Sequence, residues 1–98
     1  MTYQILVRPE AAREVQAAFD WYEEKSVGLG LEFLRAADAC LAGVKRNPLA
    51  FPAVHGQVHR ALLRKFPYML FYIVEEESII VLACFHAKRS PIDWLRRV

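Results

Sequence analysis

The sequence predicts one α+β domain with the element order β-α-α-β-β-β, in which a helical hairpin packs on one face of an antiparallel sheet. The chain has 98 residues and is 55% hydrophobic, which suits one core and is too short for two. Apolar residues recur at helical spacing in the first half, and three β-rich runs with short connections fill the second half. Helices followed by strands, rather than alternating with them, are typical of the α+β class.

The chain begins with a strand and a helix. Residues 3–7 form a short, partly β-branched apolar run, which predicts a strand. Pro9 follows it, and the fixed φ of proline suits the first position of a helix, where Glu10 also complements the helix dipole. An apolar stripe then recurs at helical spacing through Ala11, Val15, Ala18 and Tyr22.

A second helix completes a hairpin. The segment Gly28-Leu29-Gly30 interrupts the first pattern and predicts a helix–helix turn, because it lacks the further glycine and the preceding strand of a phosphate loop. The apolar pattern resumes at Phe33 and continues to Val44. Asn47-Pro48 ends it, since a residue before proline avoids the helical region.

The second half predicts an antiparallel meander. A loop rich in turn residues spans 47–56, and β-rich runs follow at residues 58–64, 68–75 and 79–86. Their connections are short enough for hairpins, and the first strand of the chain is expected beside a later one. In the run 58–64, alternation places Arg60 and Arg64 on one face and His59 on the other, and either face can be the one that the helices cover.

Composition argues against a membrane, metal or secreted protein. The longest strongly apolar stretch, residues 79–85, is far below the roughly 18 residues that cross a bilayer, and the start lacks a basic leader, so a cytoplasmic address is expected. Cys40 and Cys84 lie among apolar residues and are expected to be reduced core cysteines. Three histidines, at spacings that match no usual metal site, predict neither metal nor cofactor: His55, His59 and His86.

Charge is distributed unevenly along the chain. The net charge is +2, but residues 57–98 hold seven basic and four acidic side chains, whereas residues 1–56 hold six and seven. This asymmetry is compatible with an acidic or polyanionic partner, and an ordinary solvated surface produces it as well.

Four features in this order resemble the RelE/ParE toxin superfamily, and most closely its ParE-like, plasmid-stabilisation branch. They are the Gly28-Leu29-Gly30 bend before Glu32-Phe33-Leu34, the pair Asn47-Pro48, the basic run from Val58 to Tyr68, and the ending His86-Ala87-Lys88-Arg89-Ser90-Pro91. The resemblance covers nearly the whole chain. It implies a β-α-α-β-β-β fold, a cognate antitoxin encoded nearby, and a toxic activity released when that antitoxin is degraded.

The resemblance leaves two activities to choose between. RelE-like members cut messenger RNA on the ribosome, which requires a base, an acid and cations that stabilise the phosphorane. Here those roles would fall to Arg60, Arg64, Lys65 and His86, with His59 as a second proton carrier. That branch keeps a tyrosine or a His-Tyr pair near its C-terminus, where this chain has His86-Ala87 and then Trp94, which has no hydroxyl.

We therefore expect no catalytic residue and no enzyme. The ParE-like branch poisons DNA gyrase by binding, so gyrase or a related topoisomerase is the expected target. The ribosome-dependent nuclease is the first alternative and an inactive toxin-fold binding module is the second. Neither a membrane nor direct sequence-specific recognition of nucleic acid is expected.

Two surfaces are candidates for partner binding. An aromatic residue flanked by cations is typical of interface centres, which points to the C-terminal tail for the target: Lys88, Arg89, Trp94, Arg96 and Arg97. The alternative is that Trp94 folds back onto the core. For the antitoxin we select Trp21, which lies about 100° from the apolar stripe of the first helix, together with Ala17 and Ala18 on the flank beside it. Packing of Trp21 inside the hairpin is the favoured alternative, since most helical tryptophans are buried. A free sheet edge could add a strand from the antitoxin.

Overall fold

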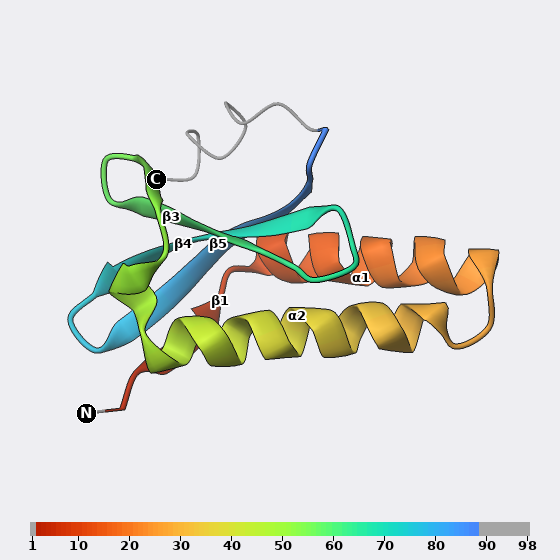
Figure 1. Cartoon of the computed structure of the whole chain (residues 1–98), viewed down its shortest axis with the longest axis horizontal. Helices are drawn as coiled ribbons and strands as arrows, with labels where there is room; N and C mark the ends of the chain where they lie inside the picture. Colours follow the sequence, from red (N-terminus) through yellow and green to blue (C-terminus); the bar gives the residue numbers. More distant parts are fainter. Residues whose placement is uncertain (1, 89–98) are drawn as a thin grey trace.

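The computed structural model describes residues 2–88 and has the predicted α+β architecture. Two helices pack on one face of a five-stranded sheet (Figure 1). The elements, in chain order, are β1 (Gln4–Val7), α1 (Pro9–Lys25), α2 (Leu29–Arg46), a 3-10 turn η1 (Pro48–Ala50), β2 (Ala53–His55), β3 (Val58–Leu62), β4 (Tyr68–Glu75) and β5 (Ser78–His86). Neither helix within residues 2–88 is both long and apolar enough to cross a membrane.

The sheet has the strand order β1-β5-β4-β3-β2 and differs from the prediction in two details. Strands β3, β4 and β5 form the expected antiparallel meander. However, β1 runs parallel to β5, so the sheet is mixed. The pairing is parallel because the helical hairpin and the meander return the chain to the side of β1 running in the same direction. The predicted loop 47–56 also contains β2, which pairs with β3 at the edge of the sheet.

Glycine determines how closely the two helices approach. Gly28 is the N-cap of α2 and has a φ of 91°, which an L-residue rarely adopts. The sequence pattern placed Gly30 in the connection between the helices. In the structure Gly30 is instead buried within the first turn of α2. A Cβ at Gly30 would lie 2.8 Å from the backbone oxygen of Phe19 and 2.9 Å from its ring. The hairpin is therefore as tight as it is because residue 30 has no side chain.

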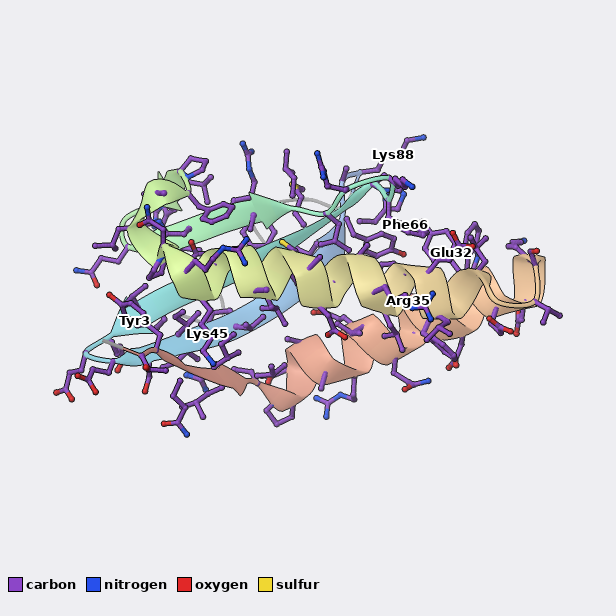
Figure 2. The ribbon with its side chains drawn as sticks, turned by 60° about the horizontal axis from the view of Figure 1, so that its bottom comes forward. Tyr3, Glu32, Arg35, Lys45, Phe66 and Lys88 are labelled. Atoms are coloured by element: carbon purple, nitrogen blue, oxygen red, sulfur yellow. The ribbon has the colours of Figure 1, made fainter. Side chains whose placement is uncertain are left out.

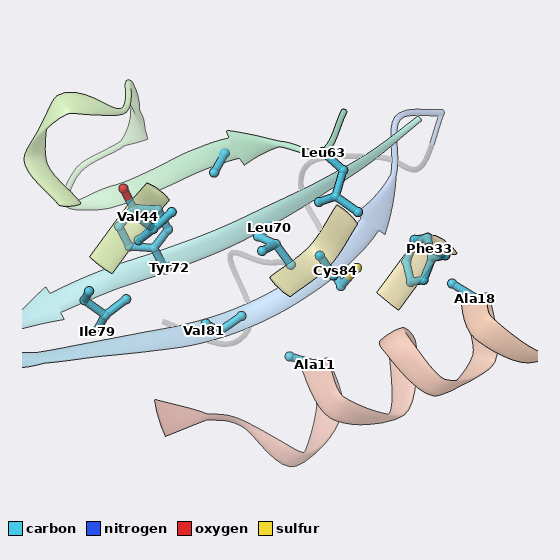
Figure 3. Packing of buried hydrophobic residues seen from close by; sticks show 12 residues of the cluster. Ala11, Ala18, Phe33, Val44, Leu63, Leu70, Tyr72, Ile79, Val81 and Cys84 are labelled. Carbon is cyan, nitrogen blue, oxygen red and sulfur yellow. The ribbon is translucent and has the colours of Figure 1, made fainter. Parts of the chain in front are cut away.

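The core has two parts, one on each face of the sheet. Between helices and sheet, Ala11 and Ala18 of α1 and Phe33 and Val44 of α2 meet inward side chains of β4 and β5 (Figure 3). Ala61 and Leu63 belong to this part, so the helices cover the face that also carries His59. On the opposite face lies a second buried cluster, made of Val58, Phe71, Leu82, Ala83 and Phe85.

Candidate functional site

A cleft of about 560 Å³ opens between α1 and one end of the sheet. One wall is the flank of α1, formed by Glu14, Ala17, Ala18, Trp21 and Tyr22. The other wall comes from the sheet and its loop, formed by Pro67, Tyr68, Cys84 and His86. All three residues selected for antitoxin binding thus line one cleft, whereas the four residues of the sheet wall were not selected.

Trp21 is exposed at the rim of this cleft. Its exposed fraction is 52%, so the favoured interpretation, packing inside the helical hairpin, is wrong. Tyr22 takes the inward position instead and stacks on Phe33 at 5.5 Å between ring centroids. The indole packs edge-on against Tyr22, and the Nζ of Lys25 lies 4.7 Å from its ring centroid. These contacts hold an exposed aromatic side chain in place.

The base of the cleft is an aromatic cluster. The ring centroid of Tyr22 lies 4.9 Å from that of Phe66 and 6.1 Å from that of Tyr68. Phe33 packs edge-on against both of those rings. Burial raises the pKa of Tyr22 and is also the main cause that raises the pKa of Tyr68. Both phenols therefore stay neutral at physiological pH, and the cleft offers largely apolar walls in which Glu14 is the one acidic residue among those described.

A β-bulge brings His86 and Cys84 to the cleft. Tyr72 pairs with Val81 and Phe71 pairs with Ala83, so Leu82 is the extra residue of β5. Beyond the bulge, alternation is shifted by one, and Cys84 and His86 point to the helix side. The backbone N–H of Cys84 donates to Oε1 of Glu14 at 3.0 Å, which ties β5 to α1.

Both cysteine thiols are free and unreactive by their surroundings. Burial, followed by Glu14 and Cys40, raises the pKa of Cys84 to about 12. Burial likewise raises the pKa of Cys40 to about 11. Neither forms a thiolate near neutral pH, so a nucleophilic role is unsupported.

Two of the residues considered for nuclease chemistry, His59 and Arg60, lie apart from the others. His59 donates from Nδ1 to the carbonyl oxygen of Phe51 at 2.9 Å and stacks on Tyr72, which is a structural role. Arg60 lies on the opposite face of β3 from His59, and its Nε is buried without a hydrogen-bond partner among the described residues. Arg64 and Lys65 are exposed in the β3–β4 loop. Arg64 follows Arg60 by four residues, which is roughly 13 Å of extended chain.

Arg64, Lys65, His86 and Lys88 do come together at one end of the sheet. The N–H of Ala87 donates to the carbonyl oxygen of Pro67 at 2.7 Å, which fastens the end of β5 to the β3–β4 loop. The N–H of Lys88 donates to Nδ1 of His86 at 3.0 Å, so the ring proton of a neutral His86 is on Nε2. Tyr68 lies directly across from His86, with ring centroids 5.2 Å apart.

The tail residues selected for target binding are mostly outside the described part of the chain. Lys88 is described and exposed. Arg89, Trp94, Arg96 and Arg97 lie beyond residue 88 and outside the described residues. Within residues 2–88, no three His, Cys, Asp or Glu side chains gather as metal ligands.

Comparison with known proteins identifies similar sequences and structures. Residues 5–91 match the family described as the ParE toxin of the type II toxin–antitoxin system parDE. A chain in the solved structure titled "Chromosomal ParDE TA system from P. aeruginosa" is similar in fold, with a TM-score of 0.73 and 16% identity over 86% of this chain and 95% of that chain. No curated protein matches the sequence.

Proposed function

Because the chain belongs to the ParE toxin family of type II toxin–antitoxin systems, we propose that it halts growth by binding DNA gyrase or a related topoisomerase, and that a cognate antitoxin neutralises it. Its place of action is then the cytoplasm. The antitoxin docks in the cleft on α1, and the target meets the basic C-terminal region that starts at Lys88.

The observation that carries the antitoxin proposal is the half-exposed Trp21 at the rim of an apolar cleft. Large apolar side chains that stay exposed beside a concave surface are typical of protein-binding sites, and tryptophan is enriched among residues that dominate binding energy. Ala17 is exposed next to it, and small residues there let a helix approach α1 closely. An amphipathic antitoxin helix would bury its apolar face in such a groove.

Action by binding is supported by the state of the possible catalytic groups. His59 is committed to Phe51 and Tyr72, and Arg60 is away from the other cations. The one specific feature that favours the nuclease alternative is the contact of Tyr68 with His86 beside Arg64 and Lys65. Burial raises the pKa of Tyr68, which makes its phenolate a scarce general base near neutral pH.

Antitoxin docking is tested by affinity measurements on the purified pair. Trp21→Ala should weaken binding by about 30-fold or more, as expected for a central aromatic residue. Leu49→Ala is the matched control, because Leu49 is 67% exposed on η1, away from the cleft. Circular dichroism should show both variants folded. Wild-type affinity of the Trp21 variant would contradict the proposed docking site.

The target is tested by two assays on one sample of purified toxin. Gyrase supercoiling should be inhibited, and addition of the antitoxin should restore it. Translation of a reporter transcript should proceed without cleavage of the message. Codon-positioned cleavage would favour the nuclease instead, and no effect in either assay would favour an inactive binding module.

A further inference from the structure

Charge is polarised along the β4–β5 hairpin. At one end stand three exposed cations, Arg64, Lys65 and Lys88, which we call the basic end. At the other end the hairpin turns through Glu75, Glu76 and Glu77, all exposed. β4 has eight residues, so the two groups are roughly 25 Å apart. Opposite charges at the two ends of a sheet orient the molecule in the field of a charged partner.

Backbone hydrogen bonds hold the basic end together. The N–H of Leu63 donates to the carbonyl oxygen of Tyr68 at 3.0 Å and closes the β3–β4 loop. The hydrogen bond from the N–H of Ala87 to the carbonyl oxygen of Pro67 holds the backbone just before Lys88 against that loop. Lys65 has a φ of 69°, a left-handed conformation that an L-residue adopts only where the loop imposes it. The three cations therefore project from a fixed backbone.

The two segments that form the basic end contain no acidic residue, and the acids near them are engaged or accompanied by a cation. Residues 63–69 and 84–88 include no Asp or Glu. On the neighbouring α1, Glu14 binds the N–H of Cys84. On α2, Glu32 lies on the same side of the molecule as Phe66 and Lys88, and Arg35 accompanies it there (Figure 2). The basic end keeps its positive charge after these neighbours are counted.

We propose that the basic end binds the phosphate backbone of duplex DNA without reading its sequence. This rests on the proposed function, because a toxin seated on a topoisomerase is carried next to the DNA which that enzyme holds. Exposed Lys and Arg side chains suit phosphate contacts, which position a protein and carry no sequence information. An acidic protein partner is the competing occupant, and the test below separates the two.

The physical role of the contact is to strengthen a complex that protein contacts have already formed. Three phosphate contacts alone give weak affinity, in the range of about 10⁻⁴ M or weaker at physiological salt. When the toxin sits on a DNA-bound enzyme, the same contacts act at a high effective concentration and add to the overall affinity. The basic end thus favours the DNA-loaded form of the target over the free form.

The experiment measures binding of purified toxin to a fluorescent duplex oligonucleotide by anisotropy as salt is varied. Three contacts predict a slope of log K against log salt of about −2.7, so affinity falls roughly 40-fold between about 50 and about 200 mM salt. The double variant Lys65→Ala/Lys88→Ala should reduce the slope to about −0.9 and the fall to roughly 3.5-fold. The matched control is Lys45→Ala/Arg46→Ala, which removes the same charge from exposed residues of α2 at the end of the molecule away from Lys88 (Figure 2).

The outcomes are distinct. A lower slope in the basic-end variant with an unchanged slope in the control supports the proposal. Equal loss in both variants shows a net-charge effect and overturns it, as does absence of binding at the lowest salt. Tighter binding to polyglutamate than to the duplex overturns it in favour of an acidic protein partner. No topoisomerase is present, so failure of supercoiling inhibition in the separate assay bears on the proposed function alone.

Discussion

The contact between the helices can be tested with two glycines on one helix. Gly30→Ala places a methyl group 2.8 Å from the backbone oxygen of Phe19 and 2.9 Å from its ring. Gly43→Ala places the same group 3.7 Å from Arg46 and 3.8 Å from Phe51, which are ordinary van der Waals distances. The two substitutions are chemically identical and differ in the space available.

The two substitutions are expected to change the free energy of unfolding in opposite directions. In a helix, alanine is favoured over glycine by up to about 1 kcal/mol, and this gain applies in full at Gly43. At Gly30 the clash is with backbone, so the helices must move apart, and such overpacking costs about 1–3 kcal/mol and outweighs the helical gain near the N-terminus of α2. We expect Gly43→Ala to raise Tm by about 4–8 °C and Gly30→Ala to lower it by a similar or larger amount.

Urea denaturation followed by circular dichroism measures both effects. The midpoint should shift while the slope m stays constant, which shows that stability and not the extent of unfolding has changed. A Gly30→Ala protein as stable as the wild type would refute the argument, because it would mean that α1 and α2 can separate freely. Loss of stability in Gly43→Ala would refute the other half.

Further substitutions test single contacts. The Glu23 carboxylate accepts hydrogen bonds from the N–H groups of Gly28 and Gly30 at 3.0–3.1 Å, so Glu23→Ala should lower the free energy of unfolding by about 1 kcal/mol, whereas the exposed neighbour Glu24→Ala should stay within about 0.5 kcal/mol. The Tyr72 hydroxyl donates to the carbonyl oxygen of Pro48 at 2.6 Å, so Tyr72→Phe should destabilise by about 1–3 kcal/mol in urea titrations, because the buried carbonyl loses its donor. Burial, followed by Cys40, raises the pKa of Tyr72 from 10.0 to about 12. The neutral hydroxyl of Tyr72 therefore contributes its full stability below about pH 10, and that contribution is lost as the pH rises toward 12. Between these pH values Tyr72→Phe should lose less stability than the wild type. Native Cys84 should resist alkylation at pH 8 and react once urea unfolds the chain, and mass spectrometry that finds it modified in the folded state would contradict its burial.

Local rules were sufficient for most element boundaries. Pro9 starts α1 and Asn47-Pro48 ends α2 because proline restricts its own backbone and that of the residue before it. The bounds of β4 were predicted to the residue, since a continuous apolar, β-branched and aromatic run fits no helix face. Strand β2 was missed because its three residues are all exposed and show no alternation; its conformation comes from pairing with β3.

Features that depend on distant residues were not predictable in the same way. The parallel pairing of β1 with β5 joins segments more than 70 residues apart. The role of Gly30 depends on the position of Phe19, which no local pattern states. The exposure of Trp21 had one usable indication: Lys25 follows it by four residues, and that spacing places a cation over the indole on a helix surface.

The sheet wall of the cleft was missed because of the bulge at Leu82. Counting outward from the pair Glu75–Ser78, a regular hairpin would place Phe85 opposite Tyr68 and turn His86 away from the helices. The extra residue shifts the register, so that His86 faces Tyr68 and the N–H of Cys84 reaches Glu14. The same shift places Leu82 and Ala83 together in the outer cluster. One inserted residue therefore brings the His86 ring to the cleft and gives the Cys84 N–H its hydrogen bond to Glu14 of α1.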